Sequence, residues 1–264
     1  MTMQRENLVA IGAYIIGDEI ISGRRQDKHF AKLIELLGTR GLQLNWATYI
    51  GDERPRLVEA LRRSFASNDI VLAFGGIGAT PDDHTRQAAA AALGVELELH
   101  PEAEREIRGR FADDPNCTPE LLQRRLRLGE FPAGARVIPN PFNRICGFSV
   151  GDHWFMPGFP EMAWAMTEWV LDTHYRHLHH AREIAREAIL VFGAGEGDLL
   201  DLMNAISEKY AGASLSSLPS FGGNGVRRHI ELGMCGDPQQ VVAAMAEIRA
   251  ELSRRGIEWQ ALDQ

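Results

Sequence analysis

The sequence predicts an α/β protein: a three-layer αβα sandwich around a mostly parallel sheet, followed by a small α+β domain. In the first half, buried apolar runs alternate with amphipathic helical segments, which is typical of a parallel sheet covered on both faces. Near residue 180 the order changes to strand, helix, two strands and a final helix. We therefore expect two domains, residues 1–178 and 179–264.

Three continuous apolar runs are predicted to be the first parallel strands, over residues 8–16, 42–50 and 70–74. A helix is expected directly after Asp27, with Asp27 as its cap. Apolar residues then recur at i, i+3, i+4 and i+7, which is one helical stripe. The expected buried stripe is Phe30, Leu33, Ile34 and Leu37.

The later elements follow from the same signals. Gly151-Asp152 separates two short apolar runs and predicts a hairpin of residues 147–150 and 153–156. Thr118 is expected to cap one of two helices in the less regular middle part. Further helices are expected over residues 83–93, 102–111, 119–128, 198–210 and 238–255, and further strands near 137 and over 188–192, 214–218 and 227–234.

The composition is that of an ordinary globular protein, with 45 % hydrophobic residues and a net charge of 28 − 36 = −8 over 264 residues. A chain this acidic argues against general nucleic-acid binding, which needs a basic surface. The apolar runs are far shorter than the roughly 18 residues that a membrane span needs. Three widely spaced cysteines indicate neither a disulfide framework nor a zinc site. We expect a cytoplasmic protein with no nucleic-acid or membrane partner.

Three loops follow the carboxyl ends of the three N-terminal strands, and each combines glycine with acid. They begin at Gly17-Asp18-Glu19, at Gly51-Asp52-Glu53 and at Gly75, the last running to Asp83. In an open parallel sheet, ligands bind outside the carboxyl ends of the strands. We therefore expect all three loops to meet at one ligand site.

The third loop is the most informative. Gly75, Gly76 and Gly78 allow the backbone to approach a ligand closely, with N–H groups free to hold an anion. The positive end of the following helix would face the same place, which suits a phosphate group. A purely structural turn, with Asp83 as a helix cap, remains the alternative.

The acids in these loops would repel a bare phosphate. Asp52, Asp82 and Asp83 therefore suggest a divalent ion, Mg²⁺ first, between carboxylate and phosphate, because hard cations prefer oxygen ligands.

The ordered motifs resemble the family of the competence/damage-inducible protein CinA, in its molybdopterin-binding-like domain. The resemblance covers nearly the whole chain, and residues 188–264 are similar to the small middle domain of that family. Proteins such as MogA and gephyrin resemble it more distantly. The motifs that carry the resemblance are Gly17-Asp18-Glu19-Ile20-Ile21-Ser22-Gly23, Tyr49-Ile50-Gly51-Asp52, Phe74-Gly75-Gly76-Ile77-Gly78-Ala79-Thr80-Pro81-Asp82-Asp83-His84-Thr85, Asn140-Pro141 and Met156-Pro157-Gly158-Phe159-Pro160-Glu161-Met162.

The resemblance implies a site for a pterin phosphate or an adenine nucleotide. Similar CinA domains hydrolyse ADP-ribose-type pyrophosphates with a divalent metal, and MogA-like domains adenylylate molybdopterin. The two acids of these relatives correspond to Asp52 and Asp83, and Asp82 is the additional acid of the CinA branch. The family also implies a homodimer. Exposed aromatic side chains would support one, and the candidates are Trp154, Phe155, Phe159, Trp164 and Trp169.

Two departures from the CinA pattern stand out. Asp27-Lys28-His29 occupies the place where CinA usually has Asp-Thr-Asn. The C-terminal nicotinamide-mononucleotide deamidase domain of CinA is not expected either, since the sequence stops at Gln264.

The leading hypothesis is a metal-dependent nucleotide pyrophosphatase with an ADP-ribose-like substrate. Asp52 and Asp83 would be catalytic, and Asp82 and Asp83 would hold the metal. The expected substrate-binding residues are Gly17, Asp18, Glu19, Gly75, Gly76, Gly78, Thr80 and Thr85.

Two alternatives stay open: a non-catalytic module that binds a pterin or nucleotide phosphate, and a molybdenum-cofactor biosynthesis protein. The Asp27-Lys28-His29 departure favours the binding module, whereas the retained Asp82-Asp83 pair favours the enzyme.

Overall fold

The computed structural model describes residues 9–181, 183–223 and 226–262, and it divides into two compact units, one up to His179 and one from His180. The first unit holds a mixed six-stranded sheet, and the second holds a separate antiparallel sheet. The predicted fold class, an α/β sandwich followed by a small α+β domain, is confirmed.

The sheet of the first unit is mostly parallel. Four strands run parallel in the order β2-β1-β3-β8, and β7 and β6 continue the sheet in antiparallel pairings. The predicted hairpin at Gly151-Asp152 is confirmed by the pairing of β7 with β8. Leu8, the expected start of the first strand, lies outside the described residues. The strands are β1 (Ile11–Ile16), β2 (Trp46–Ile50), β3 (Ile70–Phe74), β6 (Arg136–Ile138), β7 (Gly147–Val150) and β8 (His153–Met156).

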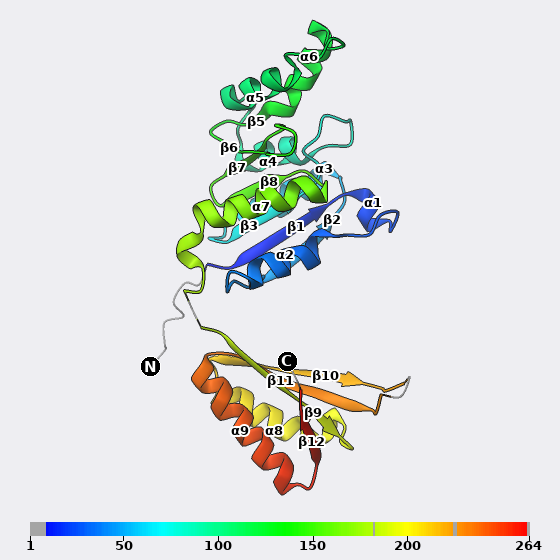
Figure 1. The fold of residues 1–264 in the computed structure, drawn as a ribbon, viewed down its shortest axis with the longest axis vertical. Helices are drawn as coiled ribbons and strands as arrows, with labels where there is room; N and C mark the ends of the chain where they lie inside the picture. The colour runs from blue at the N-terminus through cyan, green and yellow to red at the C-terminus, as the bar shows by residue number, and fades with distance from the viewer. Residues whose placement is uncertain (1–8, 182, 224–225, 263–264) are drawn as a thin grey trace. The chain divides into compact units, whose positions relative to one another are not determined.

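Helices cover both faces of this sheet, α2 and α7 on one side and α3 and α4 on the other (Figure 1). Strand β1 shows why both faces must be covered. Its residues Ala13 and Ile15 pack into the core under α2 and α7, whereas Tyr14 and Ile16 pack into the core under α3 and α4, as the twofold periodicity of a strand requires. The helices are α2 (His29–Gly38), α3 (Arg54–Phe65), α4 (Thr85–Leu93) and α7 (Pro160–His174).

The buried face of α2 differs from the predicted stripe. Phe30 and Ile34 are 38 % and 48 % exposed, while His29 is buried and faces the sheet. Asp27, the predicted cap, lies one residue before the cap position, because Lys28 is the N-cap residue of α2. Its carboxylate nevertheless accepts hydrogen bonds from the backbone N–H of His29 and Phe30, so it satisfies the first turn as a cap would. The stripe through His29, Leu33 and Leu36 also has helical spacing, but a search for apolar residues does not detect it since it begins with a histidine.

Short elements extend the first unit. Thr118 caps α6 as expected, its Oγ1 accepting a hydrogen bond from Leu121 N at 3.2 Å. The two-stranded pairing of β4 with β5 was not predicted, because three-residue strands carry too little periodicity. These elements are α1 (Asp18–Ile21), β4 (Leu97–Leu99), α5 (Pro101–Phe111), α6 (Pro119–Leu126) and β5 (Glu130–Pro132).

The second unit is a four-stranded antiparallel sheet in the order β10-β11-β9-β12, with two helices on one face (Figure 1). A separate cluster of apolar side chains fills the space between that face and the helices. Strand β12 was not predicted, because its side chains are mostly exposed. The elements are β9 (Ala185–Phe192), α8 (Glu196–Lys209), β10 (Ala213–Ser220), β11 (His229–Gly236), α9 (Pro238–Arg254) and β12 (Glu258–Ala261).

Two of the aromatic residues proposed for an interface belong to the core instead. Trp154 and Phe155 are 1 % and 0 % exposed, because strand β8 lies inside the sheet, between β3 and β7. Phe159, at 58 % exposure, remains accessible. Within the described residues, no helix is both long and apolar enough to cross a membrane.

Candidate functional site

The first two acidic loops meet at the carboxyl ends of β1 and β2. The Asp18 N–H donates to Asp52 Oδ2 at 2.8 Å, and the Asp52 N–H donates to Asp18 Oδ1 at 3.1 Å. Gly51 makes this approach possible, since a Cβ at that position would lie 2.3 Å from Asp18 Oδ1. The first two loops therefore come together, and two reciprocal hydrogen bonds join them.

The charges of three carboxylates on the first and third loops act on Asp52; we call Asp18, Glu19, Asp52 and Asp82 the acidic cluster. Burial raises the pKa of Asp52, and the negative charges of Asp18, Glu19 and Asp82 raise it further, whereas a backbone hydrogen bond at Asp18 opposes the rise. The charged form of Asp52 is therefore electrostatically costly, and a cation beside it would relieve that cost.

The glycine loop, residues 75–83, can be built only with glycine at its start. Gly75 and Gly76 have φ angles of +106° and +67°, a region that favours glycine. A Cβ on Gly75 would lie 2.2 Å from the Ile16 carbonyl oxygen, and one on Gly76 would lie 2.2 Å from Thr85 Oγ1. The loop is thus pressed against β1 and α4.

Three carbonyl groups of the glycine loop are drawn toward the start of α4. Gly75 O accepts from Thr85 Oγ1 at 3.0 Å, Gly76 O accepts from Thr85 N at 2.9 Å, and Gly78 O accepts from Arg86 Nη2 at 2.5 Å. All peptide bonds between described residues are trans, so the N–H that follows each carbonyl points the opposite way.

The N–H groups that point away from α4 are those of Gly76, Ile77 and Ala79. None of the three donates a hydrogen bond to another described residue. Backbone N–H groups left without a partner in a glycine-rich loop are the kind of donor that binds anions.

Thr85 and Asp83 have roles that differ from those predicted. Thr85 is completely buried, and its hydroxyl donates to Gly75 O, so it supports the loop from behind instead of facing a ligand. Helix α4 begins at Thr85 with His84 as its N-cap residue, so Asp83 does not cap it. Asp83 Oδ2 instead accepts hydrogen bonds from the backbone N–H of Thr80, at 2.9 Å, and from its hydroxyl.

The two acids of the predicted metal pair lie beside the same threonine. Thr80 donates to Asp83 Oδ2, and a hydrogen bond with Thr80 lowers the pKa of Asp82. The charge of Asp82 in turn raises the pKa of Asp52. Among the described residues, no three histidine, cysteine or acidic side chains come together in a way that could hold a metal ion.

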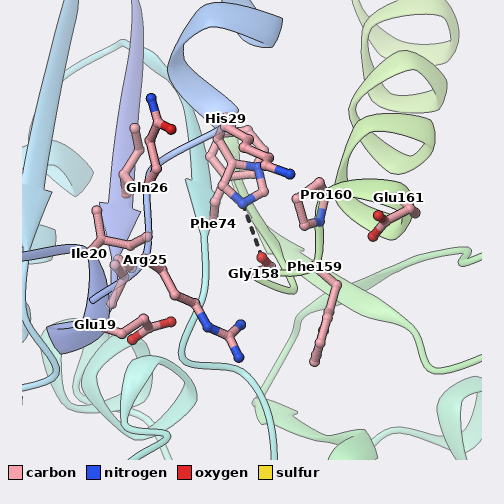
Figure 2. A pocket seen from close by; sticks show the side chains of 13 residues that line it. Glu19, Ile20, Arg25, Gln26, His29, Phe74, Gly158, Phe159, Pro160 and Glu161 are labelled. Carbon is pink, nitrogen blue, oxygen red and sulfur yellow. Dashed lines mark hydrogen bonds between the residues drawn. The ribbon is translucent and has the colours of Figure 1, made fainter. Parts of the chain in front are cut away.

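A pocket of about 390 Å³ opens beside the acidic cluster, with Glu19 as a shared residue. Its floor includes Phe74, the last residue of β3, and Arg25 and Phe159 extend along it from different loops (Figure 2). Gly158 joins the pocket to the glycine loop, because a Cβ there would lie 3.4 Å from Gly75 Cα. Pocket, acidic cluster and glycine loop are thus neighbouring parts of one site.

His29 lies in the wall of this pocket, stacked on Phe74 with 4.7 Å between the ring centroids. Its Nε2–H donates to the Gly158 carbonyl at 3.2 Å (Figure 2), which leaves Nδ1 as the acceptor nitrogen. Nδ1 is buried and has no partner among the described residues. Burial lowers the pKa of His29, so the ring is neutral at pH 7.

Arg25, Phe159 and Arg86 were not among the residues predicted for the ligand site. Arg25 had a usable signal, since it follows the first acidic loop within seven residues of Asp18. Phe159 lay inside a recognised motif, but it was expected at a dimer interface and not at the ligand site. Arg86 had no such signal, because only the tertiary structure places its side chain behind the glycine loop.

Residues 12–177 match the sequence family described as the probable molybdopterin binding domain. The chain belongs to this family. The molybdopterin-binding domain accounts for the whole sheet of the first unit and for all three loops of the site.

Curated relatives of this molybdopterin-binding-domain protein are CinA-like proteins. The one from Geotalea uraniireducens is 30 % identical over 252 residues, covering 93 % of this chain and 58 % of the relative. The one from Anaeromyxobacter sp. is 36 % identical over 160 residues, covering 59 % of this chain and 38 % of the relative. The chain spans about half the length of the curated relatives it matches.

A solved structure agrees with this placement. The protein CinA from Thermoplasma acidophilum, described as of unknown function, superposes with a TM-score of 0.54 at 25 % identity, over 62 % of this chain and 96 % of the other. The resemblance to CinA inferred from the sequence motifs is confirmed by these matches.

Proposed function

We propose that the first unit binds a pyrophosphate-containing nucleotide, or a phosphorylated pterin, and hydrolyses its phosphoanhydride with the help of a divalent ion. The observation that carries this proposal is the set of outward N–H groups of Gly76, Ile77 and Ala79 beside the acidic cluster. Anion donors next to anionic side chains make chemical sense when a phosphate and a cation bind together.

Each part of the site has a separate task in this proposal. The three N–H groups hold phosphate oxygens and stabilise charge that develops on them. Asp52 and Asp18, fixed by their reciprocal hydrogen bonds, hold the cation and orient the attacking water. The ion, Mg²⁺ in the first instance, would neutralise phosphate charge and polarise the phosphorus–oxygen bonds.

The pocket beside the cluster suits the remainder of the ligand. Phe159 offers an exposed aromatic face and Arg25 a planar cation. A ring system such as adenine or pterin stacks on such groups. Its volume, about 390 Å³, is within the range of small-molecule sites.

Binding without catalysis is the second candidate, and the position of Asp83 favours it. An acid that already accepts two hydrogen bonds from Thr80 has fewer lone pairs left for a metal or a water. In that case the same site would carry or sense the ligand, or serve molybdenum-cofactor biosynthesis.

The decisive experiment measures binding and turnover on the same samples. Calorimetry and thermal-shift assays with ADP-ribose, with and without Mg²⁺, test binding; a hundredfold excess over Kd should stabilise the protein by about 2.7 kcal/mol. Release of AMP and ribose phosphate tests turnover. Binding with turnover that falls roughly 10²-fold in Asp83→Asn supports the enzyme with a catalytic Asp83. Binding without turnover with any divalent ion leaves the binding module, and the absence of binding by nucleotides and pterins refutes both.

A further inference from the structure

Arg86 carries a buried charge that the proposed function has not used. It is 3 % exposed, and it is the only lysine, arginine or acidic residue classed as buried in the described part of the chain. Its guanidinium donates to three backbone carbonyls, those of Gly78, Arg127 and Glu130. It forms no ion pair with any described residue, and its Nε has no partner there.

This arrangement is costly unless the charge is useful. Burial lowers the pKa of Arg86, and the charges of Glu130 and Asp83 only oppose that shift from a distance. A buried charge without a close counter-ion destabilises a protein, and an apolar side chain of similar length would fill the space at lower cost. Packing alone therefore does not account for an arginine here.

The contact with Gly78 indicates what the side chain does. By drawing the Gly78 carbonyl toward α4, Arg86 turns the following N–H, that of Ala79, to the other side of the loop. A lysine could supply the charge but not the planar fork that reaches several carbonyls at once.

We infer that Arg86 is a positioning residue that adapts the glycine loop to anionic ligands. It holds the Gly78–Ala79 peptide with its N–H toward the ligand, and it places a positive charge directly behind the loop. The inference rests on the proposed phosphate-binding role of this loop, and the ligand class that it requires is a phosphate or pyrophosphate group.

The test compares three variants with two probes, inorganic pyrophosphate and ADP-ribose, each with Mg²⁺. Arg86→Met keeps the length and removes the charge, Arg86→Lys keeps the charge and removes the fork, and Arg105→Met removes an exposed charge from α5 as a matched control. Calorimetry gives Kd, and thermal unfolding without ligand gives Tm.

We expect Arg86→Met to weaken binding of both probes by tenfold or more, the effect of losing an interaction with a charged group. Arg86→Lys should restore part of that affinity, and Arg105→Met should bind as the wild type does. Loss of a buried side chain can itself lower Tm. If Arg86→Lys binds more tightly than Arg86→Met while the two variants have the same Tm, the difference in Kd comes from the positioning of the loop and not from a general loss of stability.

A measurement on the unmodified protein covers the case in which Arg86→Met does not fold. In the wild type, the amide signals of Ile77 and Ala79 should shift when pyrophosphate is added. Unchanged Kd values in folded Arg86 variants would overturn the inference while the proposed function stands. Pyrophosphate binding that leaves both amide signals unmoved would overturn the inference together with the phosphate-binding role of the glycine loop in the proposed function. A wild type that binds neither probe contradicts both.

Discussion

At the scale of single residues, the acids of the site separate into two kinds. Asp52 lies in the acidic cluster, where burial and neighbouring charges raise its pKa. Asp83 is engaged inside the glycine loop by Thr80. Two residues that were predicted to act together thus stand in different electrostatic surroundings.

Replacing Asp52 tests the cost of the cluster. When folding raises the pKa of a carboxyl, the protein loses stability as pH rises from the pKa of that group in the unfolded chain, near 3.8 here, through its pKa in the folded protein. Asp52→Asn should therefore raise Tm of the ligand-free protein at pH 7, while Mg²⁺-dependent turnover of ADP-ribose falls by roughly 10²-fold.

Asp27→Asn is the control for turnover, since Asp27 serves the start of α2 and lies outside the acidic cluster. Both of its carboxylate oxygens accept hydrogen bonds, one of them also from the Tyr49 hydroxyl, and asparagine keeps only one acceptor oxygen. The variant should therefore lower Tm and leave turnover nearly unchanged. If the Tm of Asp52→Asn at pH 7 is equal to or lower than that of the wild type, the charge of Asp52 does not destabilise the folded protein.

At the scale of elements, the start of α4 supports the glycine loop. Thr85 donates both its hydroxyl and its backbone N–H to this loop. The helix and the loop therefore form one rigid unit, and changes in the first turn of α4 should reach the ligand.

Thr85→Val is nearly isosteric and removes only the hydroxyl. It leaves Gly75 O without that buried partner, which should destabilise the protein by about 1–3 kcal/mol and weaken pyrophosphate binding. Denaturant titration and calorimetry measure the two effects. The control is Thr39→Val at the C-cap of α2, where the hydroxyl donates to Leu36 O. It should lower stability without weakening pyrophosphate binding, and a parallel loss of binding there would contradict the local explanation.

The contact between β8 and α3 predicts a pH dependence of stability. His153 is buried, its Nε2 bonds to Ser64 Oγ at 2.9 Å, and burial lowers its pKa to about 4. The unfolded chain takes up a proton near pH 6.5 while the folded chain does not, so stability should fall as pH drops from 6.5 toward 4, by about 3 kcal/mol in all.

Urea denaturation at pH 7 and pH 5 checks this expectation. The neighbouring acids Asp69 and Asp152 oppose the shift and should be left in place. His153→Gln should reduce the difference between the two pH values by the share of His153, while His29, whose pKa is also lowered by burial, keeps its own share. An unchanged difference would assign it to other groups.

At the scale of the whole molecule, the two units have separate sheets and separate apolar cores. Residues 1–179 and 180–264, expressed separately, should therefore each unfold cooperatively. Circular dichroism with thermal unfolding tests this, and a molten or insoluble fragment would show that one unit depends on the other.

The homodimer stays a prediction. Fewer aromatic side chains are accessible for its interface than the sequence led us to expect. Trp154 and Phe155 are core residues, and the accessible candidates are reduced to Phe159 and the half-buried Trp164 and Trp169. Light scattering should give twice the chain mass of 29.3 kDa. A mass near 29 kDa at micromolar concentration would contradict the dimer.

The sequence by itself determined the order of the main strands and helices, the site edge of the sheet and the glycine loop. These features depend on residues a few positions apart, such as the continuous apolar run of β1 or the turn at Gly151-Asp152. Patterns of this length can be recognised without knowing the tertiary contacts. Short strands such as β12 carry no such pattern, because their side chains are mostly exposed, and they were not predicted.

Only the tertiary structure decided which side chains meet. Asp18 and Asp52 bond across 34 residues, and Arg86 reaches carbonyls that lie 41 and 44 residues further along the chain. His29 turns inward because Phe74 and Gly158 supply a stacking partner and a hydrogen-bond acceptor. Local spacing cannot encode such contacts, since they depend on how strands and helices pack together. Packing also determined that the Thr85 hydroxyl bonds to the glycine loop, whereas Asp52 bonds to the backbone of Asp18.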